Sequence, residues 1–155
     1  MLEIFYDKTE IRLQNQTKKH VRFDTKTEKV YLDDFDASHP GEYEKFGVLL
    51  EVKEYREILF YKMLIEGKHV CIVTADKFEL KEEILSFFGD IDVLIIVGTK
   101  DAVKIFENIE AKVVIPYTEG KDIFLNTLSQ HGEEVSKYKS KWEINGDVTE
   151  FVNLK

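Results

Sequence analysis

The sequence has little that could form a covalent framework or a membrane anchor. Cys71 is the single cysteine among 155 residues, so an internal disulfide is excluded. It lies in the apolar run 70–73, where a thiol usually behaves as a small buried hydrophobe. No apolar stretch approaches the roughly 20 residues that a membrane-spanning helix needs, and the sequence does not begin with a secretory signal pattern. We therefore expect a soluble, cytoplasmic protein that has no membrane partner.

Basic residues are scarce relative to acidic ones. The chain has 22 Lys and Arg against 30 Asp and Glu, which gives a formal charge of −8 at pH 7. Nucleic-acid affinity depends largely on basic groups that displace counterions from phosphates, so we expect no nucleic-acid partner. The chain is long enough for one hydrophobic core and short for two. Residues 1–155 are therefore predicted to form a single domain.

Glycine and proline are also few, at eight and two residues, so each marks a specific turn. The first half of the sequence is rich in β-formers, and Glu66-Gly67-Lys68 separates two strand-like runs as a hairpin turn does. The acidic stretch around Pro40-Gly41 is predicted to leave regular structure. The predicted strands of this half are 2–6, 10–13, 21–23, 29–32, 48–52, 58–65 and 69–74.

The second half alternates between helical and strand patterns. Residues 92–98 form a continuous apolar run, which predicts a strand covered on both faces. Gly89 ends a helical pattern as a C-terminal glycine does. Helices are predicted at 81–88, 101–109 and 121–131, with a further strand at 112–115, so the sequence contains two strand-helix-strand steps. A C-terminal hairpin is predicted from 141–144 and 148–152.

Four segments in this half follow one another in a familiar order and spacing. They read GEYEKFGV at 41–48, EGKHVCIVTAD at 66–76, FFGDIDVLIIVG at 87–98 and IEAKVVIPYTEG at 109–120. With these segments the chain resembles the metallo-β-lactamase superfamily, specifically the small metal-dependent hydrolases similar to ascorbate-6-phosphate lactonase. The resemblance implies an α/β (α+β) fold, a trimmed αββα sandwich of two mixed sheets flanked by helices.

The resemblance also implies where metal ligands should lie, and this sequence has other residues there. Relatives hold zinc or manganese at strand ends through an H-x-H-x-D-H motif, which this chain lacks. Asp7-Lys8 corresponds to an early Gly-His pair, and Thr118 to a late ligand histidine. The bridging aspartate corresponds to Ala75, and a slip of one residue to Asp76 would turn the carboxylate to the opposite face of a strand. We therefore expect no inherited metal site, no cofactor and no hydrolase activity of the family type.

An acidic stretch, DDFDASHPGEYE at 33–44, is the densest group of potential ligands in the chain. Asp36, His39 and Glu42 could in principle rebuild a catalytic metal site, because a histidine beside carboxylates suits zinc or manganese. The stretch lacks the alternating acidic pattern and central glycine of a calcium loop, and no second histidine lies close by. We interpret it as a turn with solvated carboxylates, at the point where a shortened connection rejoins the fold.

Thr99 and Lys100 are a second candidate, for binding a small anion. They follow a predicted strand and open a predicted helix, where an anion can meet free backbone amides. The glycine-rich consensus of a phosphate loop is missing, and a helix-capping role for Thr99 explains the same pattern. For His20, His69 and His131 we expect surface or capping roles.

Aromatic residues are plentiful, with seven Tyr, eleven Phe and one Trp. Loss of a loop and a helix should uncover apolar surface, which often marks an interface; alternatively, the aromatic residues fill a rearranged core. The leading hypothesis is a non-catalytic, metal-free scaffold that acts by binding a protein or a small ligand, as a homo-oligomer or as the partner of another protein. The alternative is a metal-dependent hydrolase of a small ester or phosphoester with a relocated site at Asp36, His39 and Glu42.

Overall fold

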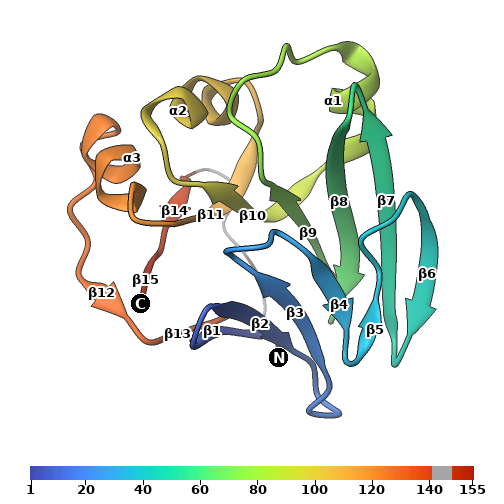
Figure 1. The fold of residues 1–155 in the computed structure, drawn as a ribbon. Coiled ribbons are helices and arrows are strands. Elements are labelled where there is room, and N and C mark those ends of the chain that lie inside the picture. Colours follow the sequence, from blue (N-terminus) through green and yellow to red (C-terminus); the bar gives the residue numbers. More distant parts are fainter. Residues whose placement is uncertain (141–147) are drawn as a thin grey trace.

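The computed structural model describes residues 1–140 and 148–155. Two large sheets are stacked face to face, and three helices lie against one of them (Figure 1). The first sheet has the strand order β13-β1-β2-β3-β4-β5. Its strands are β1 (Glu3–Asp7), β2 (Glu10–Gln14), β3 (His20–Asp24), β4 (Val30–Leu32), β5 (Phe35–Asp36) and β13 (Lys137–Lys139).

The second sheet has the order β14-β11-β10-β9-β8-β7-β6. Strands β6 to β9 pair antiparallel with one another, whereas the pairs β9–β10, β10–β11 and β11–β14 are parallel, so this sheet is mixed. Its strands are β6 (Gly41–Lys45), β7 (Val48–Tyr55), β8 (Ile58–Ile65), β9 (Lys68–Val73), β10 (Ile91–Val97), β11 (Ala111–Tyr117) and β14 (Glu150–Phe151). A small third sheet pairs β12 (Glu134–Val135) with β15 (Asn153–Leu154).

The two predicted strand-helix-strand steps are confirmed. α1 (Glu82–Phe88) connects β9 to β10, and α2 (Lys100–Glu107) connects β10 to β11, while α3 (Lys121–Thr127) follows β11. Gly89 closes α1 with a positive φ of 56° and donates its N–H to the carbonyl of Leu85, as a helix-terminating glycine does. α3 is shorter than predicted, since it ends at Thr127 and not at His131.

The second sheet is buried on both faces, which explains the continuous apolar run of β10. Val93 and Ile95 belong to the core between the two sheets, whereas Leu94 and Ile96 belong to the core between the sheet and the helices. Residues of all three helices contribute to this second core, including Ile84, Ile105 and Phe124. The described molecule is therefore a three-layer sandwich of sheet, sheet and helices.

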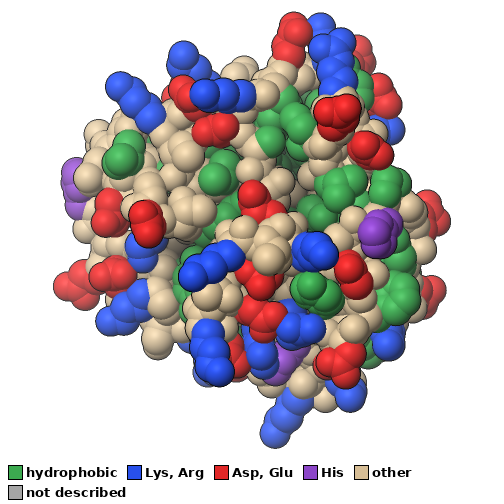
Figure 2. Space-filling model, in the orientation of Figure 1, with side chains coloured by type: hydrophobic (Ala, Val, Ile, Leu, Met, Phe, Trp, Pro, Cys, Tyr) green, Lys and Arg blue, Asp and Glu red, His purple; other side chains and the backbone are tan. Residues whose placement is uncertain are grey.

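The outer face of the first sheet carries charged side chains, and no described helix covers it. Arg12 lies 3.0 Å from Asp7 and 3.1 Å from Glu10, and Arg22 pairs with the same Glu10. Figure 2 shows acidic and basic side chains mixed over this side of the molecule. Because its outer face carries paired charges, this sheet can contact solvent there without the outer helix layer of a full αββα sandwich. The apolar surface that we expected from a trimmed fold does not lie on this face.

Every pairing in the first sheet is antiparallel. The expectation that the acidic stretch 33–44 leaves regular structure is wrong, because it contains β5 and β6. The first strand of the predicted C-terminal hairpin, 141–144, lies outside the described residues, and β14, from its second strand, pairs parallel with β11. No helix in the described part of the chain is long and apolar enough to cross a membrane.

Candidate functional site

The parallel strands of the second sheet end at a common edge of the sandwich. β9 ends at Val73, β10 at Val97 and β11 at Tyr117, and ligands of α/β sheets usually bind beyond such carboxyl ends. At this edge, the loops after β10 and β11 lie beside the β3–β4 loop of the first sheet, at 25–29 (Figure 1).

These three loops enclose a cleft of about 690 Å³, which we call the edge cleft. Its volume falls within the range of small-molecule sites, about 300–1,000 Å³. One wall comes from the β3–β4 loop, and the others come from the loops that lead into α2 and α3. The lining residues are Thr25, Lys26, Gly98, Thr99, Lys100, Thr118, Glu119, Gly120 and Ile123.

Two glycines bring the loops after β10 and β11 into contact. A Cβ on Gly120 would lie 2.0 Å from the carbonyl oxygen of Gly98, and one on Gly98 would lie 2.6 Å from the carbonyl oxygen of Tyr117. Both separations are too short for any side chain. The N–H of Gly98 donates to that Tyr117 carbonyl at 2.7 Å, so two backbone segments meet directly at the edge cleft.

Thr99 caps α2, as the sequence predicted. Its hydroxyl accepts from the N–H of Ala102 at 3.1 Å and donates to a carboxylate oxygen of Asp76 at 2.8 Å. Asp76 thus supplies negative charge close to the start of α2, where the helix dipole favours it. Lys100 is exposed at the edge cleft. Anion binding by Thr99 and Lys100 stays a prediction, and the Asp76 carboxylate would compete with an anion for this place.

Tyr117 joins the second sheet to the β3–β4 loop. Its side chain is fully buried, its ring packs edge-on against Phe23 with ring centroids 5.0 Å apart, and its hydroxyl donates to Glu28 at 2.9 Å. Burial, together with the neighbouring Glu28 carboxylate, raises the pKa of Tyr117 far above its ordinary value. The phenol therefore stays protonated and keeps its hydrogen bond at any physiological pH.

The residues at the positions that the resemblance assigns to metal ligands do not fit a zinc or manganese ion. Asp7 pairs with Arg12 on the outer face of the first sheet. Ala75 has no donor atom, and the hydroxyl of Thr118 donates to the carbonyl of Gly98 at 3.3 Å. Across residues 1–140 and 148–155, no group of three or more His, Cys, Asp and Glu side chains is placed to hold a metal ion.

The structure does not bring Asp36, His39 and Glu42 together as a ligand set. Asp36, in β5, accepts from the N–H of Ser38 at 2.9 Å, and this bond is the main cause that lowers the pKa of its carboxyl group. His39 is exposed, and its backbone carbonyl accepts from the hydroxyl of Tyr43 at 2.7 Å. Glu42 is exposed on β6. The three residues therefore do not form the metal site that the sequence suggested.

The other reactive side chains have structural surroundings. Cys71 is buried, and burial raises the pKa of its thiol to about 12, so it is a poor nucleophile. His20 opens β3 on the outer face of the first sheet, His69 lies near the start of β9, and His131 is exposed beyond α3. His131 is exposed as expected, whereas His20 and His69 are half-buried; surface or capping roles for these two stay predictions.

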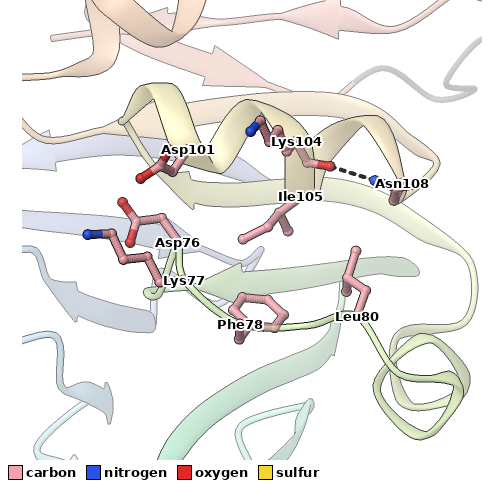
Figure 3. Close-up of a pocket in the computed structure, with 8 residues that line it drawn as sticks. All are labelled: Asp76, Lys77, Phe78, Leu80, Asp101, Lys104, Ile105 and Asn108. Atoms are coloured by element: carbon pink, nitrogen blue, oxygen red, sulfur yellow. Dashed lines mark hydrogen bonds between the residues drawn. The ribbon is translucent and has the colours of Figure 1, made fainter.

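A second, smaller cleft of about 370 Å³ lies between α2 and the loop after β9. Figure 3 shows the carboxylates of Asp76 and Asp101 at one end, and Phe78, Leu80 and Ile105 along the rest. The two carboxylates lack a third ligand among the described residues, so this cleft offers an apolar wall with an acidic end and no metal site.

Sequence reasoning missed the contribution of the β3–β4 loop. Thr25 and Lys26 line the edge cleft, and Glu28 accepts the Tyr117 hydrogen bond across 89 residues of sequence. No local pattern indicates either role. The available signal was indirect: a tyrosine ends the largely apolar strand β11, and a buried tyrosine hydroxyl needs a partner.

Comparison with known proteins places the fold. The sequence matches no known protein family and no curated protein. The structure is similar to the crystal structure of a protein from Thermotoga maritima, assigned as a zinc-dependent hydrolase of the metallo-β-lactamase superfamily. The alignment covers 98% of both chains with a TM-score of 0.70 and 20% sequence identity. The chain therefore has the metallo-β-lactamase fold.

Proposed function

We propose that this protein is a non-catalytic scaffold with the metallo-β-lactamase fold, which binds a small ligand in the edge cleft without a metal ion. The observation that carries the proposal is that hydrogen-bonded pairs, and not metal ligands, occupy this edge of the sandwich. Tyr117 donates a hydrogen bond to Glu28, and Thr99 donates one to Asp76. The edge cleft beside these two pairs is open.

The chemistry of these side chains supports a role without metal. A catalytic zinc ion needs about three protein ligands from His, Asp, Glu or Cys and one open position. Ala75 and Thr118 offer no such ligands, and the protonated phenol of Tyr117 is a hydrogen-bond donor. The carboxylate of Asp76 already accepts from Thr99 at 2.8 Å. Catalysis of the zinc-hydroxide type therefore has no basis in these residues.

The lining of the edge cleft supports binding of a polar molecule. Threonine hydroxyls come from all three loops, at Thr25, Thr99 and Thr118; each donates its proton within the protein, so it can only accept from a ligand. Lys26 and Lys100 add two positive charges against the negative charge of Glu119. Ile123 contributes an apolar side chain that is 56% exposed. Few polar groups around a concave surface are typical of small-molecule sites.

The experiment measures thermal unfolding with inorganic phosphate, citrate, glucose 6-phosphate and adenosine monophosphate as probes. Ligand at about 100 times its Kd adds about 2.7 kcal/mol to the unfolding free energy, or roughly 5–10 °C in Tm for a protein of this size. We expect at least one probe to stabilise the protein, and Ile123→Trp to remove the effect by filling the edge cleft.

Leu85→Trp is the matched control, because Leu85 is also an exposed helix residue, at 39%, but lies on α1 away from the cleft. The control should keep the full stabilisation. Equal stabilisation in Ile123→Trp, or no stabilisation of the wild type by any probe, would argue against ligand binding at this cleft. Loss of a metal-dependent esterase or phosphoesterase activity on His39→Ala would instead establish the relocated hydrolase site.

A further inference from the structure

β6 forms one edge of the seven-stranded sheet. It pairs with β7 on one side, and no described strand pairs with its other side. In Figure 1 this edge faces outward at the right of the molecule. An edge strand presents a row of unpaired N–H and C=O groups, to which another chain can add as a strand.

The side chains next to this edge are acidic with an apolar centre. Glu42 lies directly opposite Glu51, and Glu44 directly opposite Leu49. Like charges directly opposite each other destabilise a strand pair, and none of these three glutamates has a cationic partner among the described residues. Lys62, next to Glu51 on β8, lies with its ammonium 5.9 Å from the ring centroid of Phe87.

Leu49 adds an exposed apolar contact. It is 46% exposed although it is paired with Glu44 in the β6–β7 ladder. Shallow hollows of about 310 and 390 Å³ flank the pair, and both are lined by Glu42 and Glu51. Figure 2 shows hydrophobic side chains between acidic ones on this side of the molecule.

Charge decides which chain can occupy the edge. A second copy of β6, paired antiparallel around Tyr43, would set Glu42 of each copy against Glu44 of the other. Like charges would then face each other at both positions, which disfavours self-pairing. A strand with Lys or Arg at these alternate positions would neutralise the carboxylates, and its intervening apolar residues would lie on the face of Tyr43.

We propose that the free edge of β6 binds an extended, basic segment of a partner protein as an additional strand. Backbone hydrogen bonds along β6 would supply binding, and alternate side chains would supply the choice of partner, as in other strand-addition complexes. This surface is separate from the edge cleft, so the proposal does not depend on ligand binding there.

The test uses a fluorescent peptide, acetyl-Lys-Val-Lys-Val-Lys-amide, titrated with the full chain at low salt. We expect saturable binding, at least tenfold weaker for Glu42→Lys/Glu44→Lys, together with slower hydrogen exchange of β6 amides. The control variant Glu107→Lys/Glu110→Lys makes the same change in net charge at exposed positions on and after α2, and it should bind like the wild type.

A second peptide separates strand addition from charge attraction. Acetyl-Lys-Val-Lys-Pro-Lys-amide has the same charge, but its proline removes a backbone donor and disfavours a ladder. We expect it to bind at least fivefold more weakly. Equal affinity for both peptides, equal weakening in the two double variants, or no binding would overturn the proposal and leave the glutamates as guards against edge-to-edge association.

Discussion

Tyr117 is the residue that links the two sheets at the edge cleft. It is buried against Phe23 and donates to Glu28 at 2.9 Å. Tyr117→Phe keeps the ring and removes only the hydroxyl, so we expect a loss of about 1–2 kcal/mol in unfolding free energy, since hydrogen bonds to charged groups contribute about 1.5–3 kcal/mol and Glu28 is exposed. Urea denaturation measures it.

Tyr55→Phe serves as the control for this change. Tyr55 is half-buried, and its hydroxyl has no hydrogen-bond partner in the described part of the chain. Its loss should change stability by less than about 0.5 kcal/mol. Equal effects of the two substitutions would mean that the Tyr117–Glu28 hydrogen bond does not stabilise the fold.

His20 makes stability depend on pH. Burial, and then the positive charge of Arg12, lowers its pKa from the ordinary value of 6.5, and the carboxylates of Asp7 and Asp33 oppose this only in part. The unfolded chain therefore takes up a proton at a higher pH than the folded one. The stability that neutral His20 contributes is complete above pH 6.5 and is lost as the pH falls through the lower folded pKa.

We expect the urea midpoint to fall between pH 7.5 and 5.5 in the wild type, and to fall less in His20→Asn. The remaining histidines are present in both proteins, so the difference between the two proteins reports His20 alone. An identical fall in both would show that His20 titrates normally in the folded state.

At the scale of elements, the contact between the loops after β10 and β11 depends on glycine. Gly120→Ala would bring a Cβ to 2.0 Å from the carbonyl oxygen of Gly98, so the loops must separate. Overpacking of this kind costs about 1–3 kcal/mol, and ligand binding in the edge cleft should weaken with it. Gly132→Ala is the control, because nothing lies within 4 Å of its added Cβ; an equal cost there would contradict the explanation.

β10 contributes to both cores at once. Leu94 faces the helices and Ile95 faces the first sheet, and both are fully buried. Each substitution to alanine should cost about 2–5 kcal/mol, measured by urea denaturation. A small cost for Leu94→Ala alone would mean that the helix layer packs only loosely on the second sheet.

At the scale of the whole molecule, two apolar cores hold the sandwich together. We expect protein purified without added metal to contain less than about 0.1 zinc or manganese per chain by elemental mass spectrometry, and EDTA to leave its Tm unchanged, because a folded state that binds metal is stabilised by it. A stoichiometric metal, with a lower Tm after chelation, would contradict this prediction and would indicate a metal site built from residues distant in sequence. The elution volume in gel filtration would give the oligomeric state from the same sample.

Much of the fold follows from the sequence because its strands have clear local patterns. The strand at 58–65 has the predicted bounds, and the strand predicted at 92–98 is β10, at Ile91–Val97, buried on both faces. β6 was missed, since Pro40-Gly41 and the dense carboxylates resemble a loop. At an edge strand only one side needs pairing, so a stretch with five exposed or half-buried residues can still form a strand.

Less of the candidate site follows from the sequence. Thr99 was correctly identified as a helix cap, and Lys100 does line the edge cleft. The Asp76 carboxylate next to Thr99 belongs to a different loop, 23 residues earlier. Asp36, His39 and Glu42 are close in sequence, but the strands β5 and β6 belong to different sheets and separate their roles.

The sequence by itself determined most of the local structure and the absence of an H-x-H-x-D-H motif. Periods of two and of 3.6 residues fix which side chains share a face, and a missing histidine motif is missing in any fold. Only the tertiary structure decided that the β3–β4 loop closes the edge cleft, that Glu28 meets Tyr117 across 89 residues, and that β6 is left with a free edge. These features depend on how the two sheets pack and on which strand lies at the edge of each sheet. The local sequence pattern does not determine either of these.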